Sequence, residues 1–198
     1  MLHVLQNVML RLVLDSTFRQ QFLSAPAQTL APLALTAEEH QALQAIAPRD
    51  LERCARSLLH KRWEQVRQVL PLSRRVCPSL QQRYRCWLAR HPAPVQCTVL
   101  TPGTAEAWRA LPHLYAVLRA DAAEAPYSAD LLAFEVLYSC ARQDGQARQL
   151  RSPFALHLLA QDIRRGLLPT EPEPCPSVYR FDQKGVQWQA QSTPGKPG

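Results

Sequence analysis

The chain has 198 residues, a formal net charge of +7, and 46% hydrophobic against 20% charged residues. This length and composition predict a folded protein of one large or two small domains. The low count of six glycines argues against a turn-rich all-β protein, and the 17 prolines fall mostly between apolar-periodic segments, where they would end helices. The absence of any run of 18 apolar residues argues against a membrane span.

Apolar residues at helical spacing predict a helical bundle at the start of the chain. The segment "TFRQQFLSA" predicts a helix that Pro26 ends, and "TAEEHQALQAI" predicts another that Pro48 closes. This last helix opens with a capping box, in which Thr36 and Glu39 each satisfy a backbone N–H of the other. The first helix is predicted over 2–14 from one stripe of residues: Leu2, Leu5, Met9, Leu12 and Val13.

A long amphipathic and strongly basic helix is predicted over 49–70. Trp63 lies on its apolar stripe, which predicts core packing, while Arg53, Arg56 and Arg67 lie on another face. Residues 49–90 contain eleven Lys or Arg and three acidic residues, so this segment carries a net +8 and the rest of the chain −1. Such a local excess implies a face that meets something acidic.

A further helix is predicted over 78–90, and the pattern changes near residue 92. A β-like run over 95–100 and a turn at Pro102-Gly103 precede a predicted helix over 104–120, in which a break at Pro112 is left open. Further along, 126–142 predicts a helix, 144–153 a loop, and 154–168 either a helix or a strand followed by a helix.

The C-terminal part combines a proline-rich acidic linker, a hairpin and a tail. "VYRFDQKGVQWQAQ" has two alternating runs around Asp182 to Gly185, which predict the hairpin, and "STPGKPG" predicts disorder. The predicted fold is therefore mostly α. We expect a helical N-terminal domain with the basic helix (1–92), a second α-rich domain with a few short strands (93–170), and the linker, hairpin and tail (171–198).

No signature of catalysis or metal binding is found in the sequence. It contains no glycine-rich phosphate loop, no H-E-x-x-H, no G-x-S-x-G and no dinucleotide-binding fingerprint. The histidines are scattered singly, and Asp130 and Glu135, five apart on one predicted helix, do not point the same way. The six cysteines lack C-x-x-C spacing. They favour buried thiols in a reducing cytoplasm, with a secreted disulfide framework as the other alternative.

Three segments, in this order, carry a resemblance to a known family. These are "LVLDSTFRQQFLSAPAQTLAPLALTAEEHQALQAI", "LERCARSLLHKRWEQVRQVLPLSRRV" and "PYSADLLAFE". Over about residues 10–165 the chain resembles TglI-type partner proteins. These accompany multinuclear non-haem iron TIM-barrel enzymes in the maturation of ribosomal peptides, including 3-thiaglutamate biosynthesis.

The resemblance implies a non-catalytic accessory subunit, in a heterodimer with the iron enzyme, that binds a precursor peptide and presents its cysteine. It implies no cofactor in this chain, with the iron held by the partner enzyme. Such partners are likened to leader-recognition modules that take a peptide as an added strand. Few strand signals precede residue 94 here, so a module of this kind is either absent or lies in the second half.

The basic residues and one tyrosine are the candidate binding residues for the peptide or the enzyme. Tyr127 is the candidate surface anchor, although packing in the first helical turn, with the hydroxyl in water, is the favoured alternative. A nucleic-acid-binding protein that uses residues 49–90 to contact phosphates is the competing function, and an enzyme acting alone is the third. The candidates are Arg53, Arg56, Arg67, Arg74, Arg75 and Tyr127.

Overall fold

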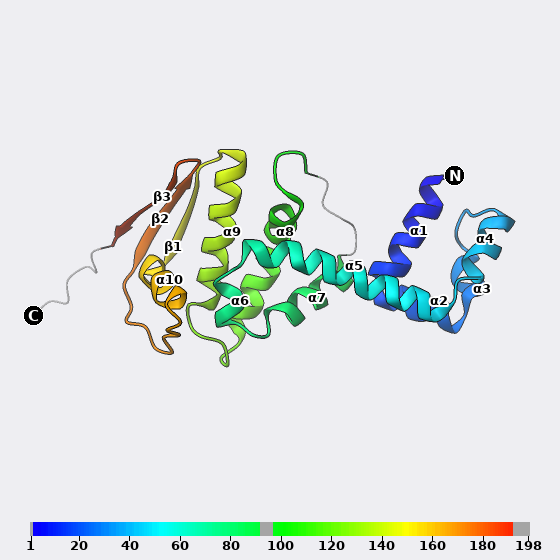
Figure 1. The fold of residues 1–198 in the computed structure, drawn as a ribbon, viewed down its shortest axis with the longest axis horizontal. Coiled ribbons are helices and arrows are strands. Elements are labelled where there is room, and N and C mark those ends of the chain that lie inside the picture. The colour runs from blue at the N-terminus through cyan, green and yellow to red at the C-terminus, as the bar shows by residue number, and fades with distance from the viewer. Residues whose placement is uncertain (1, 92–96, 192–198) are drawn as a thin grey trace, which may run out of the picture. The chain divides into compact units, whose positions relative to one another are not determined.

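The computed structural model describes residues 2–91 and 97–191, and it confirms a mostly helical fold with a small antiparallel sheet (Figure 1). The predicted tail, 192–198, and residues 95–96 of the predicted β-like run lie outside the described residues. The chain divides into two compact units, one of residues 1–63 with 85–94 and one of residues 64–84 with 95–198. The predicted domain boundaries at 92 and 170 stay predictions.

The first unit is a group of short helices around an apolar core. The capping box is confirmed: the Glu39 N–H donates to Thr36 Oγ1 at 3.2 Å, and the Thr36 N–H donates to Glu39 Oε2 at 2.7 Å. Trp63 is buried, as its place on the apolar stripe predicts. The core consists of Val8, Leu12, Phe18, Phe22, Leu30, Leu43 and Leu51. The helices are α1 (Leu2–Leu14), α2 (Ser16–Ser24), α3 (Pro26–Leu30), α4 (Ala37–Gln44) and the first part of α5 (Pro48–Val69).

Several prolines begin helices where the sequence predicted only an end or a turn. Pro26 and Pro48 are the first residues of α3 and α5, and the predicted turn at Pro102-Gly103 is in fact the first turn of α8. Proline suits this position because its missing N–H would have no partner there, and because its fixed φ is already helical.

The second unit packs helices against the sheet. Its buried cluster includes Leu131, Leu156, Ile163, Tyr179 and Phe181. Helix α9 supplies much of this core and contacts all three strands (Figure 1). Besides the end of α5, the helices are α6 (Ser73–Val76), the first part of α7 (Leu80–Arg90), α8 (Pro102–Ala120), α9 (Ser128–Asp144) and α10 (Leu156–Arg164).

The sheet has the order β1-β2-β3, with both pairs antiparallel. The predicted hairpin is confirmed as β2 (Ser177–Asp182) and β3 (Gly185–Ala190). The loop predicted over 144–153 is wrong, because Arg148–Ser152 forms β1 beside β2. The helical alternative for 154–168 is correct, and the described residues 97–100 of the predicted β-like run form no strand. All strands of the described residues thus follow residue 147.

Helix α8 runs through Pro112 without a break. Pro112 lacks the N–H that would bond to the carbonyl of Trp108, four residues earlier. Both residues are exposed, so this lost hydrogen bond lies on the solvent side, where water can replace it.

Near the start of α8, Gly103 approaches the backbone of α5. A Cβ placed on it would lie 2.8 Å from the carbonyl carbon of Gln65.

Candidate functional site

The outer edge of β3 offers unpaired backbone groups. Among the described residues, β3 pairs with β2 alone. Gln191 donates its N–H to Pro176 O at 2.8 Å, and backbone groups alternate in direction along an antiparallel strand. The alternation therefore directs the backbone groups of Gln187 and Gln189 toward β2, and those of Val186, Trp188 and Ala190 outward. An extended peptide could pair with these outward groups.

A pocket of about 550 Å³ lies beside this edge, on the side of the sheet covered by α9 and α10. Leu72, Phe134, Tyr138 and Val186 give it apolar walls. Its other lining residues are largely polar and include two arginines, one histidine and one glutamate: Arg142, Arg164, His157 and Glu135. This combination of lining residues suits a peptide in which a bulky apolar side chain is flanked by acidic residues.

Glu135 forms part of the pocket wall and holds the α5–α6 turn. Its Oε1 accepts from the N–H of Leu72 at 2.7 Å, and its Oε2 accepts from the N–H of Ser73 at 2.8 Å and from Ser73 Oγ at 2.5 Å. Burial raises the pKa of the Glu135 carboxyl to about 6, although these hydrogen bonds and the charge of Arg164 act to lower it. The carboxylate caps the start of α6 from 62 residues away in sequence.

His157 connects the pocket to β3. Its ring stacks on Trp188 with the centroids 3.8 Å apart, and Trp188 is 51% exposed. The Tyr179 hydroxyl donates to Phe154 O at 3.3 Å, so His157 Nδ1, at 3.1 Å, is the donor to the Tyr179 oxygen. Burial lowers the pKa of His157. A neutral ring therefore presents one face to a partly exposed tryptophan at the strand edge.

The predicted basic residues divide between the two units. Arg53 and Arg56 lie in the first unit, where both are exposed and Arg53 pairs with Asp50 at 3.0 Å. Arg67, Arg74 and Arg75 lie in the second unit. Of these, Arg67 is half-buried and pairs with Glu64, whereas Arg74 and Arg75 are exposed on α6.

Tyr127 is buried and is not a surface anchor. It is 1% exposed and packs edge-on against Phe154, with ring centroids 6.2 Å apart. The predicted packing at the start of the helix is confirmed, because Tyr127 directly precedes α9 and belongs to the core of the second unit, but its hydroxyl is buried with the ring instead of lying in water.

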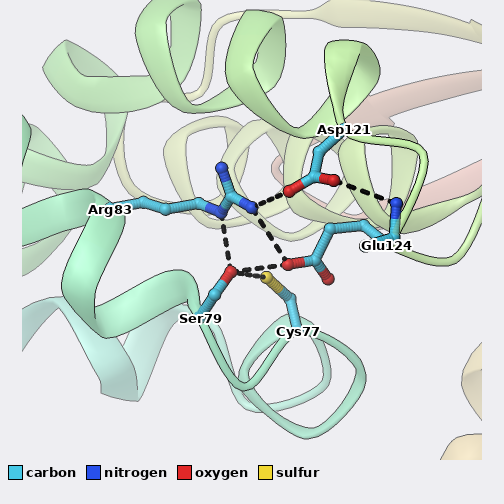
Figure 2. Close-up of polar contacts among 6 residues, drawn as sticks. Cys77, Ser79, Arg83, Asp121 and Glu124 are labelled. Carbon is cyan, nitrogen blue, oxygen red and sulfur yellow. Dashed lines mark hydrogen bonds and ion pairs between the residues drawn. The ribbon is translucent and has the colours of Figure 1, made fainter.

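Cys77 is a candidate nucleophile by residue type, and it belongs to a polar cluster of the second unit (Figure 2). Its Sγ lies 3.4 Å from Ser79 Oγ, which donates to Glu124 at 2.5 Å and accepts from Arg83 Nε at 2.6 Å. Arg83 also pairs with Asp121 and Glu124. Burial raises the pKa of the Cys77 thiol to about 11. The thiol therefore stays protonated near neutral pH, and the cluster ties the start of α7 to the α8–α9 loop rather than supplying a reactive group.

Asp130 and Glu135 point to different partners, as their spacing on α9 predicts. Asp130 accepts from the hydroxyls of Tyr115 at 2.8 Å and Ser152 at 3.0 Å, and so connects α8 to the end of β1. Among the side chains that the structure describes, within residues 4–91 and 97–191, no group of three or more His, Cys, Asp or Glu is arranged to hold a metal ion. No helix among the described residues is long and apolar enough to cross a membrane.

Sequence reasoning found the hairpin but not the site beside it. A usable signal was present: the sequence of β3 is "GVQWQA", an alternating strand without charge or proline, and such a strand is unusual at a sheet edge.

Comparisons of the chain with protein-family models, curated proteins and solved structures found no match.

Proposed function

We propose that this chain is a cytoplasmic, non-catalytic partner that binds a ribosomally made precursor peptide and presents its cysteine to an iron-dependent TIM-barrel enzyme. The proposal combines the resemblance to TglI-type proteins with one observation of the structure. This observation is the edge of β3 that no other described strand pairs with, beside a pocket with apolar walls and cationic residues.

In this proposal the leader of the peptide adds as a fourth strand to β3. Main-chain hydrogen bonds to Val186, Trp188 and Ala190 supply affinity, and alternate leader side chains enter the pocket beside α9. Arg142 and Arg164 favour acidic leader residues next to a bulky apolar one. The net charge of +8 over residues 49–90, to which the exposed Arg56 contributes, adds a positive field that speeds association with an acidic leader. Arg53 and Arg67 act within this segment as ion pairs with Asp50 and Glu64.

Replacing Ala190 with proline tests strand addition. Because the Ala190 N–H faces outward, the substitution should preserve the β2–β3 ladder while it removes one donor and obstructs the edge. We expect the melting temperature to change little and the affinity for the labelled precursor peptide to fall about tenfold or more, measured by fluorescence anisotropy.

The matched control is Gln189→Pro, which removes an N–H that faces β2 and should lower the stability of the sheet instead. Unchanged peptide affinity in Ala190→Pro would refute strand addition at this edge. Micromolar binding of the parent to random duplex DNA, together with no peptide binding, would favour the nucleic-acid function.

A further inference from the structure

The end of α10 holds two exposed leucines in a fixed geometry. Gly166 has a φ of 89° and its N–H donates to Ile163 O at 3.1 Å, while the Leu167 N–H donates to Asp162 O at 2.9 Å. This pair of hydrogen bonds is the Schellman arrangement that ends many helices. The backbone at Leu167 is therefore fixed by the cap rather than being part of a free loop.

This cap lacks its usual apolar contact. In a Schellman motif the residue after the glycine commonly packs on the residue at position C3 of the helix, which here is Asp162. Leu167 thus has no apolar partner at that position and is 58% exposed, and Leu168, which follows it, is 54% exposed. Two consecutive large apolar side chains are held at the surface.

Arginines of α6 and α10 lie near this helix end, and the groove that Leu168 lines also contains Glu124 and Glu171. The Arg75 guanidinium donates from Nη1 to Ile163 O, at the end of α10, at 3.3 Å, which brings α6 to this helix end. Val76 and Leu168 line the same groove of about 490 Å³. The exposed Arg165 is the C-cap of α10 and has Asp162 as a distant partner at 4.0 Å. The arginine–leucine patch is Arg74, Arg75, Arg165, Leu167 and Leu168.

The stability of the fold explains only part of this patch. Cations at a helix C-terminus interact favourably with its dipole, which accounts for Arg75 and Arg165. It does not account for Arg74 or for the two leucines. Exposed apolar side chains beside arginines are the composition of a protein–protein interface, with apolar residues at its centre and charge at its rim.

We propose that the arginine–leucine patch is the surface that docks the iron enzyme, through an apolar depression on the enzyme rimmed by Asp and Glu. The proposal rests on the proposed function and adds a second surface, built from residues other than those of the β3 edge and its pocket. One chain can thus hold the peptide on β3 and the enzyme at the end of α10.

Two variants of the full-length chain test this separation. One replaces the leucines (Leu167→Ser with Leu168→Ser), and the other reverses charge (Arg74→Glu with Arg165→Glu). The probes are a TIM-barrel iron enzyme and a labelled cysteine-bearing precursor peptide, the two partners of the proposed function. We expect each variant to bind the enzyme at least about tenfold more weakly than the parent, and to bind the peptide within about twofold of the parent.

Matched controls separate the patch from general effects of charge or exposed leucine. Leu158, 52% exposed on the same helix, is replaced by serine, and the exposed Arg49 and Arg90 of the first unit are both replaced by glutamate. Both controls should bind the enzyme like the parent, and all variants should keep the circular dichroism spectrum of the parent.

The possible failures are distinguishable. If the parent binds peptide and enzyme but the patch variants bind the enzyme normally, the docking inference is overturned and the proposed function stands. Equal losses in the Arg49/Arg90 control, or a parent dimer in light scattering that the patch variants abolish, would also overturn it. A parent that binds neither probe would remove the proposed function, and this inference with it.

Discussion

Glu135 places a titratable group inside the second unit, and its raised pKa makes the stability of that unit depend on pH. The folded carboxyl holds its proton up to about pH 6, against a reference value of 4.5. Between these values the folded state binds more protons than the unfolded state, so the free energy of unfolding falls as pH rises. The fall is about 2 kcal/mol and is complete above the folded pKa.

The test is chemical denaturation of the parent and of Glu135→Gln from pH 4.5 to 7. The pKa of His157 is lowered in the folded state, so below pH 6.5 this residue makes the free energy of unfolding rise with pH, opposite to Glu135. The informative quantity is therefore the difference in the free energy of unfolding between the two proteins. At pH 7 the variant should be less stable by about 1–3 kcal/mol, because one amide oxygen cannot replace a carboxylate with three donors. A difference that stays constant over this range would contradict the assignment.

At the scale of elements, the crossing of α8 over α5 depends on the absence of a side chain at Gly103. Alanine is the better helix former by up to about 1 kcal/mol, so propensity alone predicts that Gly103→Ala stabilises the protein. The added Cβ would instead collide with the backbone of Gln65, and we expect a loss of about 1–3 kcal/mol. The sign of the change in melting temperature decides between these two expectations. Ala116→Gly, at an exposed position of the same helix, is the control that changes helix propensity alone. A stabilised Gly103→Ala protein would exclude the close approach.

The elements that sequence could predict are those whose signals are local. The capping box at Thr36, the stripe on α5 and the turn between β2 and β3 each depend on residues a few positions apart, and all three are confirmed. Strand β1 was missed because "RQLRS" becomes a strand only by pairing with residues about 30 positions later.

The parts of the candidate site were missed for the same reason. Glu135 caps a turn 62 residues away, and no short window of sequence contains both partners. Tyr127 follows a proline and precedes a helix, a setting that fits a surface position as well as a buried one, and only the packing of Phe154 against it decides. The sequence shows the charge of an arginine but not its surroundings, so Arg165 was not distinguished from its neighbours.

At the scale of the whole molecule, the six cysteines form classes that thiol labelling can count. Cys54, Cys86 and Cys97 are exposed, while Cys77 and Cys140 are buried, and burial raises the pKa of both buried thiols to about 11. With Ellman's reagent at pH 8, the reduced protein should show three fast thiols, with the half-buried Cys175 slower.

The two remaining thiols should react only when guanidinium unfolds the chain. Cys77→Ser and Cys140→Ser, made separately, should each remove one thiol from this late class and none from the fast class. Six fast thiols in the native protein would mean that the second unit is far less compact than its packing implies.

The bare edge of β3 has a consequence for the protein when it is alone. Natural edge strands are commonly protected from aggregation by lysine, proline or a bulge, and "GVQWQA" has no charge and no proline. Two copies can therefore align these strands, and the resulting assembly offers further edges of the same kind. We expect the purified chain to be prone to self-association at high concentration, and a peptide on β3 to suppress it by occupying the edge. The precursor peptide that this chain is proposed to bind would then also protect the chain from aggregation, as a chaperone does.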